Sequence, residues 1–320
     1  MSATTASRPT FRNLPRGFGL IIALVVLIVA ASLISPHFLN PINVLNVLRQ
    51  VALYGILGVG MTFILLTAGI DLSISSIVGF VGVVAATLMG MGYPILLACL
   101  IGVGGGLLIG VINGLGIVIG QVPPFIMTLG SMVMTRGIAL MIADGSTVNL
   151  GPRGDEFFFL GGGFILGVPT PIWVFALVCV IAFVVLRLSP FGRAIYAVGS
   201  SPEAARLAGI NVGLVTFSVY LISAGLASLS ALIFLSRLSV GDPNSGVGLE
   251  LEAITIAVIG GTSLFGGEGG IAGTIGGAMV LAILANILNL AGVSPFSQQV
   301  VKGLIIVFAV LLEAGRRRRA

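Results

Sequence analysis

Long apolar runs, interrupted by short polar breaks or by glycine and proline, follow one another along almost the whole chain. A transmembrane helix needs about 20 consecutive apolar residues, so most of these runs are long enough to be membrane spans. The breaks divide the chain into ten expected spans, at about residues 18–36, 43–69, 73–90, 94–119, 125–143, 171–187, 213–236, 249–265, 271–290 and 297–314. The pattern therefore predicts an all-α integral membrane protein, a polytopic bundle of about ten transmembrane helices.

Two of the expected spans are irregular. The run at 73–90 is short, and the run at 125–143 follows Pro123 and Pro124 and contains Arg136. Either one can be a broken or re-entrant segment, because non-helical backbone is tolerated at membrane depth where protein or water surrounds it.

Glycine is unusually frequent, at 47 of 320 residues, roughly twice the average frequency of about 7%. A four-residue spacing puts glycines on one helix face, where it lets a neighbouring helix approach closely. We expect tight packing inside the bundle, with a dimer interface or a moving gate as alternatives. The two series with this spacing are Gly102, Gly106, Gly110, Gly114 and Gly269, Gly273, Gly277. Two glycine-bearing turns that each contain an acid, 60–73 and 261–273, also hint at an internal repeat.

The distribution of charge gives an orientation. Cytoplasmic ends of membrane helices collect arginine and lysine, and here one side would carry Arg8, Arg12, Arg16, Arg187, Arg193, Arg206 and Arg316 to Arg319, against mainly Arg153 and Arg237 on the other. We expect both termini in the cytoplasm. Residues 1–17 would be an N-terminal cytoplasmic tail, 18–314 the transmembrane domain with an inner loop at about 188–212, and 315–320 a basic cytoplasmic tail.

Composition excludes several functions. The chain is 57% hydrophobic and 8% charged, whereas soluble proteins are about 25% charged, and its cations do not form the stripe that nucleic-acid binding needs. Its single lysine, Lys302, is followed by Gly303 and Leu304, so the Gly-Lys-Ser/Thr of a phosphate-binding loop is missing. Any ATP must therefore be used by a partner. Catalytic clusters are also missing, and a single histidine, His37, argues against a metal site.

The inner loop contains a predicted short helix. Ser201, Pro202 and Glu203 form a helix start, with a capping serine, a proline suited to the first turn and an acid at the positive end of the dipole. Small apolar residues follow, and Gly209 is suited to end the helix. The product is one or two turns on the cytoplasmic face, either a contact site for a soluble partner or an ordinary amphipathic connector.

This loop resembles the cytoplasmic coupling loop of ABC importer permeases, in which Glu-Ala-Ala is followed after three residues by Gly. Further stretches are similar to the ribose-type monosaccharide permeases, and the resemblance extends from about Ser35 to Glu313. Glu268 departs from it, because many relatives would have lysine or arginine there. The stretches are 60–62, 68–73, 168–171, 192–199 and 260–264.

The resemblance implies a membrane subunit in the bacterial inner membrane that is not itself an enzyme and binds no cofactor. A separate ATPase would engage Glu203, Ala204, Ala205, Leu207 and Gly209. A soluble extracytoplasmic binding protein would deliver a monosaccharide or similar polyol, and a second permease copy or close homologue would complete the path. Position alone suggests three outer-loop acids for docking of the binding protein: Asp155, Glu156 and Asp242.

Polar residues within the spans are candidates for a path through the membrane, although hydrogen bonding between helices explains them equally well. They are Asn113, Gln121, Arg136, Asn286 and Asn289.

Asp71 follows a long apolar run, and a charge near the bilayer indicates a functional residue. If the span ends near Ala68, Asp71 lies at the cytoplasmic interface and caps the helix that begins at Ser73. Conformational coupling and proton relay are the alternatives.

Two other functions remain open. An ion-coupled secondary transporter would use Asp71 or Arg136 for coupling. A permease of the same type could instead carry branched-chain amino acids or nucleosides.

Overall fold

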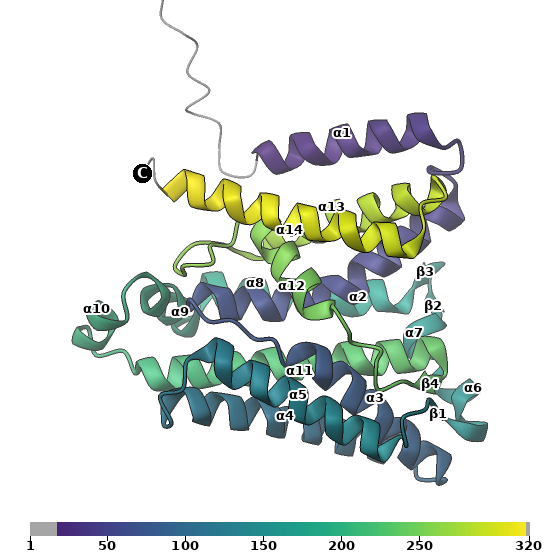
Figure 1. Cartoon of the computed structure of the whole chain (residues 1–320), viewed down its shortest axis with the longest axis horizontal. Coiled ribbons are helices and arrows are strands. Elements are labelled where there is room, and N and C mark those ends of the chain that lie inside the picture. Colours follow the sequence, from purple (N-terminus) through teal and green to yellow (C-terminus); the bar gives the residue numbers. More distant parts are fainter. Residues whose placement is uncertain (1–17, 318–320) are drawn as a thin grey trace, which may run out of the picture.

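Helices dominate the computed structural model, which describes residues 18–317 (Figure 1). The predicted tail at 1–17 and the last residues of the basic tail, 318–320, lie outside the described residues. The helices are α1 (Phe18–Ile34), α2 (Pro41–Leu66), α3 (Ile74–Gly90), α4 (Ile95–Val118), α5 (Pro124–Ile142), α6 (Gly154–Phe157), α7 (Phe159–Gly162), α8 (Thr170–Leu188), α9 (Pro190–Ser200), α10 (Pro202–Leu207), α11 (Val212–Leu238), α12 (Leu249–Ile259), α13 (Ile271–Leu290) and α14 (Pro295–Arg317). Very short elements complete the chain: a 3-10 turn η1 (Gly151–Arg153) and strands β1 (Val148–Asn149), β2 (Phe164–Ile165), β3 (Val168–Pro169) and β4 (Val240–Gly241).

The all-α membrane architecture agrees with the sequence, but the count of ten spans is not confirmed. Among the described residues, six helices are long and apolar enough to cross a membrane: α2, α4, α5, α8, α11 and α13. Helices α1 and α3 are shorter apolar helices. Helix α12 has 11 residues and is about 16 Å long, roughly half of the ~30 Å hydrocarbon core. The span expected at 249–265 ends at Ile259, because Gly261 follows with a positive φ of 86°.

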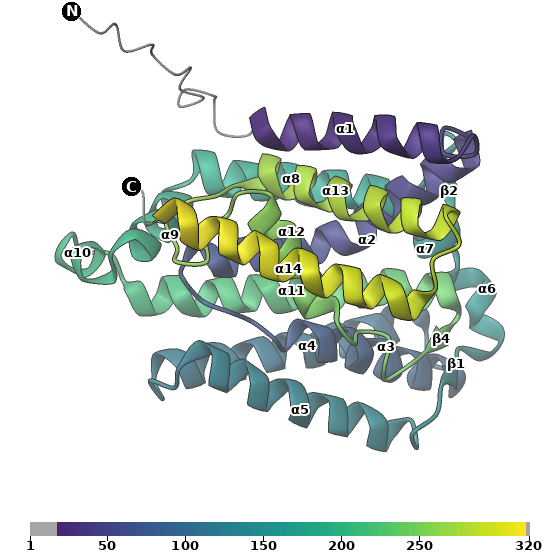
Figure 2. The same ribbon diagram turned by 45° about the horizontal axis from the view of Figure 1, so that its top comes forward.

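The bundle has two distinct ends (Figures 1 and 2). At one end lie α9 and α10, and the start of α1 and the end of α14 lie at this same end. At the other end lie α6, α7 and the four strands. There β1 pairs with β4, with Val148 opposite Gly241, so the segment after α5 is tied to the segment after α11.

Six of the seven glycines in the two series lie within α4 or α13 and face a neighbouring helix or its end, whereas Gly269 precedes α13 and packs on Thr262. A Cβ atom at Gly110 would lie 2.6 Å from that of Ala224 on α11, and one at Gly114 would lie 2.7 Å from the Phe217 ring. In the second series, a side chain at Gly277 would overlap the backbone of α12. The glycines therefore allow α4 to pack on α11 and α13 on α12, as predicted.

Capping residues fix the helix starts near α10. Ser189 accepts a hydrogen bond from the backbone N–H of Gly192 (3.0 Å) at the start of α9, and Asn211 accepts one from Leu214 (3.0 Å) at the start of α11. Helix α9 was not predicted, although Ser189-Pro190 repeats the helix-start signal of Ser201-Pro202.

Candidate functional site

Helix α10 begins and ends where the sequence predicts. The Ser201 hydroxyl accepts a hydrogen bond from the backbone N–H of Ala204 (3.2 Å). At the other end Gly209, with a φ of 80°, donates its N–H to the Arg206 carbonyl (3.0 Å). A serine cap and a left-handed glycine thus confine the helix to six residues.

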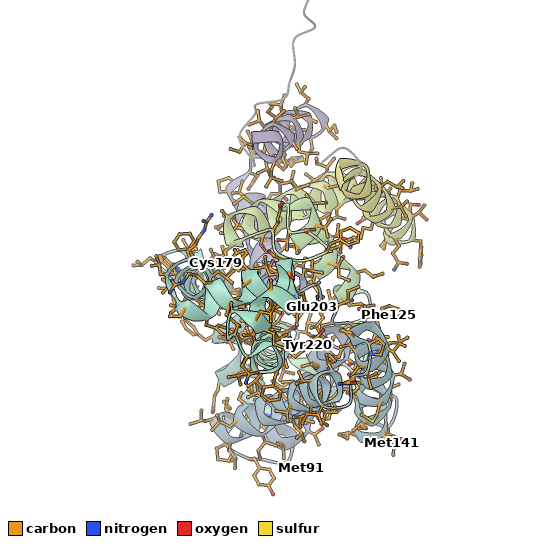
Figure 3. All side chains as sticks on the ribbon, turned by 90° about the vertical axis from the view of Figure 1, so that its left-hand side faces the viewer. Met91, Phe125, Met141, Cys179, Glu203 and Tyr220 are labelled. Atoms are coloured by element: carbon orange, nitrogen blue, oxygen red, sulfur yellow. The ribbon has the colours of Figure 1, made fainter. Side chains whose placement is uncertain are left out.

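Most of this short helix is exposed at the end of the bundle. Glu203, Ala204 and Gly209 are exposed, and the Leu207 residue is 91% exposed. Ala205 is the exception, since it is 2% exposed and belongs to the core. Figure 3, viewed from this end, shows Glu203 at the surface. Four of the five predicted coupling residues therefore face outward, and Ala205 anchors them.

Helix α9 connects α10 to the interior. The Tyr196 hydroxyl donates a hydrogen bond to the Gly269 carbonyl (3.0 Å), and burial raises the pKa of this phenol above its ordinary value, so it keeps its proton and remains a donor. Gly199 packs directly on the carbonyl of Leu66, which also accepts a hydrogen bond from the N–H of Gly267 (3.0 Å). Helix α9 thus contacts both the turn that follows α2 and the turn that follows α12.

The segment between α2 and α3 is a break inside the bundle. Asp71 is 1% exposed, and its carboxylate accepts hydrogen bonds from the Ser73 N–H (2.9 Å), the Ser73 hydroxyl (2.6 Å) and the Ser223 hydroxyl (2.9 Å). Ser223 lies eleven residues past the start of α11 at Val212, about 16 Å along that helix. Asp71 therefore orders the turn that precedes α3, whereas α3 itself, which starts at Ile74, has no side-chain cap. This turn lies deep in the bundle and not at the cytoplasmic interface where the sequence places it.

Side chains from three other helices satisfy the backbone of this break. The carbonyl of Ile70 accepts hydrogen bonds from the hydroxyls of Thr128 and Tyr220, both at 3.3 Å. Asn113 donates to the Ser73 hydroxyl (2.9 Å). Such satisfaction by protein is what permits non-helical backbone at membrane depth, and it identifies the short third span as a broken one.

A second break enters from the opposite end, over residues 242–248. Gly246 packs directly on the carbonyl of Ser75, and a Cβ atom at Gly79 would lie 2.5 Å from the carbonyl of Pro243. The sequence predicts an outer loop here, but most of the loop lies along α3. Because α12 starts at Leu249, the starts of α3 and α12 lie close together inside the bundle. Paired interrupted helices of this kind surround the substrate site in many transporters.

The predicted path residues fall into two groups, of which one lies at this meeting point. Asn113 is 1% exposed, and a guanidinium nitrogen of Arg136 lies 3.4 Å from the Ser75 hydroxyl. Each retains a buried polar atom without a hydrogen-bond partner among the described residues, the amide oxygen of Asn113 and Nε of Arg136.

The other path residues lie elsewhere. Asn286 forms a reciprocal amide pair with Asn43, at 2.8 and 3.0 Å, which joins α13 to α2. Gln121, in the link between α4 and α5, and Asn289, near the end of α13, are both exposed. The structure does not bring these three into one site.

The predicted docking acids lie at the strand-bearing end. Asp155 and Glu156 are exposed on α6, and Glu156 is 4.0 Å from Arg153. Asp242 is half-buried and accepts a hydrogen bond from the N–H of Asn244 (2.8 Å), so it is less available than the two acids on α6.

One ion pair is not predicted from the sequence. Glu252 on α12 and Lys302 on α14 are in direct contact. From the sequence, Lys302 is used only to exclude a phosphate-binding loop, and Glu252 is not singled out. An acid in one apolar segment and the only lysine in another are the signals that could have suggested the pair.

Known proteins resemble the chain over almost its full length. Residues 43–310 match the family model described as "Branched-chain amino acid transport system / permease component". The chain is 42% identical to the ribose import permease protein of Haemophilus influenzae over 91% of each chain, and 41% identical to that of Bacillus subtilis over 97% of this chain and 96% of the relative. It is 36% identical to the L-arabinose ABC transporter permease protein of Azospirillum brasilense, over 94% and 88% respectively. No solved structure matches the chain.

Proposed function

This chain belongs to the family of branched-chain amino acid transport system permease components, and we propose that it is the membrane subunit of an ABC importer for a monosaccharide or similar polyol. The family description mentions amino acids, but the relatives above are named for ribose and L-arabinose. Identity of 41–42% to the ribose permeases favours a sugar over an amino acid or a nucleoside.

The observation that carries this function is the exposed helix α10. The sequence has no phosphate-binding loop, so energy must come from a separate ATPase, and a permease of this kind also needs a substrate-binding protein. A short, rigidly capped helix with Leu207 91% exposed is suited to enter a groove on that ATPase.

The contacts of α9 support a route by which the ATPase moves the bundle. When the ATPase displaces α10, α9 moves with it, because a single residue, Ser201, separates the two helices. The close contacts of Gly199 with Leu66 and of Tyr196 with Gly269 then carry this displacement to the turns that follow α2 and α12. The turn after α2 continues into the first interrupted segment, and the turn after α12 is joined through that helix to the second, so closure of the ATPase would shift both.

The arrangement of the ends supports ten crossings with both termini in the cytoplasm. Because the described chain starts and finishes at the α10 end (Figure 2), it crosses the bilayer an even number of times. Helix α12 with its linkers, residues 242–270, counts as one crossing. Helix α3 with the segment before it, residues 67–90, counts as another. We propose that a second copy or a close homologue completes the translocation path.

Crosslinking tests the ATPase contact directly. With Cys99 and Cys179 replaced by serine, Leu207→Cys should crosslink to the ATPase subunit in membranes that contain the whole complex. Ala205→Cys is the matched control on the same helix, because Ala205 is buried and should crosslink far less. Equal crosslinking from both positions, or none from Leu207→Cys, would reject α10 as the docking helix.

Transport tests the same contact. Glu203→Trp and Gly209→Leu should abolish ATP-driven sugar uptake while leaving the protein inserted, the first by blocking the groove and the second by straining a backbone φ of 80°. Unchanged uptake by both variants would contradict the coupling role.

A further inference from the structure

A pocket lies between α2, α12, α13 and α14, on the side of the bundle that α14 covers (Figure 1). Five of its eleven lining residues are alanines and leucines of α13. Five residues that can form hydrogen bonds also line it: Gln50, Tyr54, Glu252, Thr255 and Lys302. A mostly apolar wall with a few convergent polar groups is typical of small-molecule sites.

The pocket lies at membrane depth. Lys302 is seven residues past the start of α14 at Pro295, about 10 Å along the helix. Gln50 is nine residues past the start of α2 at Pro41, about 14 Å along it. Both helices start at the strand-bearing end (Figure 1), so the pocket belongs to the half of the bundle nearer that end.

A charged pair at this depth points away from lipid. The side chains of Lys302 and Glu252 are 35% and 18% exposed in the single chain. Ionisable side chains within membrane segments face the bundle interior or a water-filled cavity, because contact with lipid is costly. The pair therefore lies in the bundle interior or beside a water-filled cavity, and not against lipid.

A purely structural explanation covers only part of the site. Glu252 lies in the first turn of α12, where the helix dipole favours an acid. That does not explain why Lys302 reaches it from α14, or why Gln50 and Tyr54 converge on the same space from α2.

A second, separate pocket lies near the strand-bearing end, between α3, α11 and β4. It is lined by Phe234, Asp242 and Ser245, among others. The rings of Phe234 and Tyr54 are 6.2 Å apart between centroids and tilted by 38°, and Tyr54 lines the first pocket. This aromatic pair thus separates the outer pocket from the charged one.

We propose that the pocket containing Glu252 and Lys302 is a solute site on the translocation path, entered past the Tyr54 and Phe234 rings. The ligand class is a monosaccharide or similar polyol, so this inference rests on the proposed function. Sugar hydroxyls would donate to the Glu252 carboxylate and accept from the Lys302 ammonium and the Gln50 amide, while the Tyr54 ring covers a face of the sugar. The sugar competes with the ion pair for the Glu252 carboxylate and the Lys302 ammonium, so the sugar binds weakly. Weak binding suits a site on a transport path, because the solute must leave it again.

Earlier candidates are less suited to this role. The amide of Asn286 is paired with the amide of Asn43 (2.8 and 3.0 Å). The amide N–H of Asn113 donates a hydrogen bond to the Ser73 hydroxyl before α3 (2.9 Å). The pocket beside α14 instead offers polar groups that already face an open space.

The test compares the complete complex, with its ATPase and binding protein, in proteoliposomes, measuring D-ribose uptake and ATP hydrolysis in the same vesicles. Glu252→Gln, Lys302→Gln and Gln50→Met should each lower the ribose moved per ATP hydrolysed by about tenfold, because each loses a hydrogen bond that is charged or lies in a solute site. Stimulation of ATP hydrolysis by the loaded binding protein should persist. Asp144→Asn, a carboxylate exposed after α5 and outside the pocket, should transport like the wild type.

The charge-exchanged double variant, Glu252→Lys with Lys302→Glu, separates a solute site from a structural ion pair. A structural pair would be restored by the exchange, so wild-type uptake by the double variant would overturn the inference. We expect restored thermal stability but reduced uptake per ATP. If the double variant fails to assemble, Gln50→Met decides, because it leaves the ion pair intact and wild-type uptake would overturn the inference equally.

The proposed function fails separately. If the wild-type complex takes up no D-ribose, L-arabinose or D-xylose with ATP, the sugar assignment is wrong and the inference falls with it. If the wild type transports and all pocket variants match it, only the inference is wrong.

Discussion

At the scale of single residues, Asp71 is the best example of a polar group held inside the membrane part by its neighbours. Three hydrogen bonds, two from Ser73 and one from Ser223, surround a carboxylate that is 1% exposed. They join the start of α3 to α11. These three donors favour a structural role for Asp71 over a proton relay.

Replacement of Asp71 separates this structural role from proton relay. Asp71→Asn keeps an acceptor for Ser73 and can donate to Ser223, so ATP-driven uptake should persist with a small loss of stability. Asp71→Ala leaves buried donors without an acceptor and should cost about 2–4 kcal/mol of unfolding free energy. Sugar uptake and thermal unfolding of the purified complex should be measured for both variants.

The same variant addresses the ion-coupled alternative. A secondary transporter would need no ATPase, would take up solute under a proton gradient in liposomes, and would lose that uptake in Asp71→Asn. Gradient-driven uptake by the isolated chain that disappears in this variant would contradict the assignment as an ABC permease.

Sequence reasoning identified Asp71 because a charge after an apolar run is a local signal. It did not find the pairs of Asn43 with Asn286 or Glu252 with Lys302, whose members are 243 and 50 residues apart. Only the packing of α2 on α13 and of α12 on α14 creates these pairs, and no spacing in the sequence encodes either contact.

At the scale of elements, α9 links the exposed α10 to the two interrupted segments. The link depends on close backbone approach, because Gly199 packs on the Leu66 carbonyl without room for a side chain. The periodicity of apolar residues predicted the long helices with boundaries within a few residues. It missed α9 and overextended the span at 249–265, because neither α9 nor α12, each of 11 residues, produces a membrane-length apolar run.

A methyl group at Gly199 should disturb this link. Gly199→Ala forces α9 away from the turn after α2, and overpacking of this kind costs about 1–3 kcal/mol. We expect a lower thermal unfolding midpoint and less sugar transported per ATP. The matched control is Gly104→Ala in α4, where nothing lies within 4 Å of the added carbon, so stability should stay the same or rise. Wild-type uptake in Gly199→Ala would show that α9 does not transmit the movement.

At the scale of the whole molecule, the two ends of the bundle are built for different tasks. One end presents a rigid six-residue helix. The opposite end presents exposed acids on α6, next to the short ladder in which Val148 lies opposite Gly241. Charge placement predicted which segments share an end, since the arginine bias follows alternate loops, but it could not show that residues 242–248 turn inward.

Charge reversal at the strand-bearing end tests docking of the binding protein. The double variant Asp155→Lys with Glu156→Lys should weaken the stimulation of ATP hydrolysis by the loaded binding protein several-fold, mainly through slower association, and the effect should shrink at high salt. Basal ATP hydrolysis should not change. Ala291→Lys, which adds a positive charge in the exposed turn after α13, is the control, and equal losses in both would indicate a nonspecific effect of charge.

The contact between α12 and α14 also constrains how the protein is made. Glu252 leaves the ribosome 50 residues before Lys302, which at about 5–20 residues per second is a delay of several seconds. During that time α12, with an unpaired Glu252 carboxylate, is too short and too polar to be inserted by the translocon alone. We therefore expect α12 to settle into the bundle only after α14 has been synthesised, so that a truncation before Lys302 would leave biogenesis unfinished even though the longer spans that precede α14 had already been inserted.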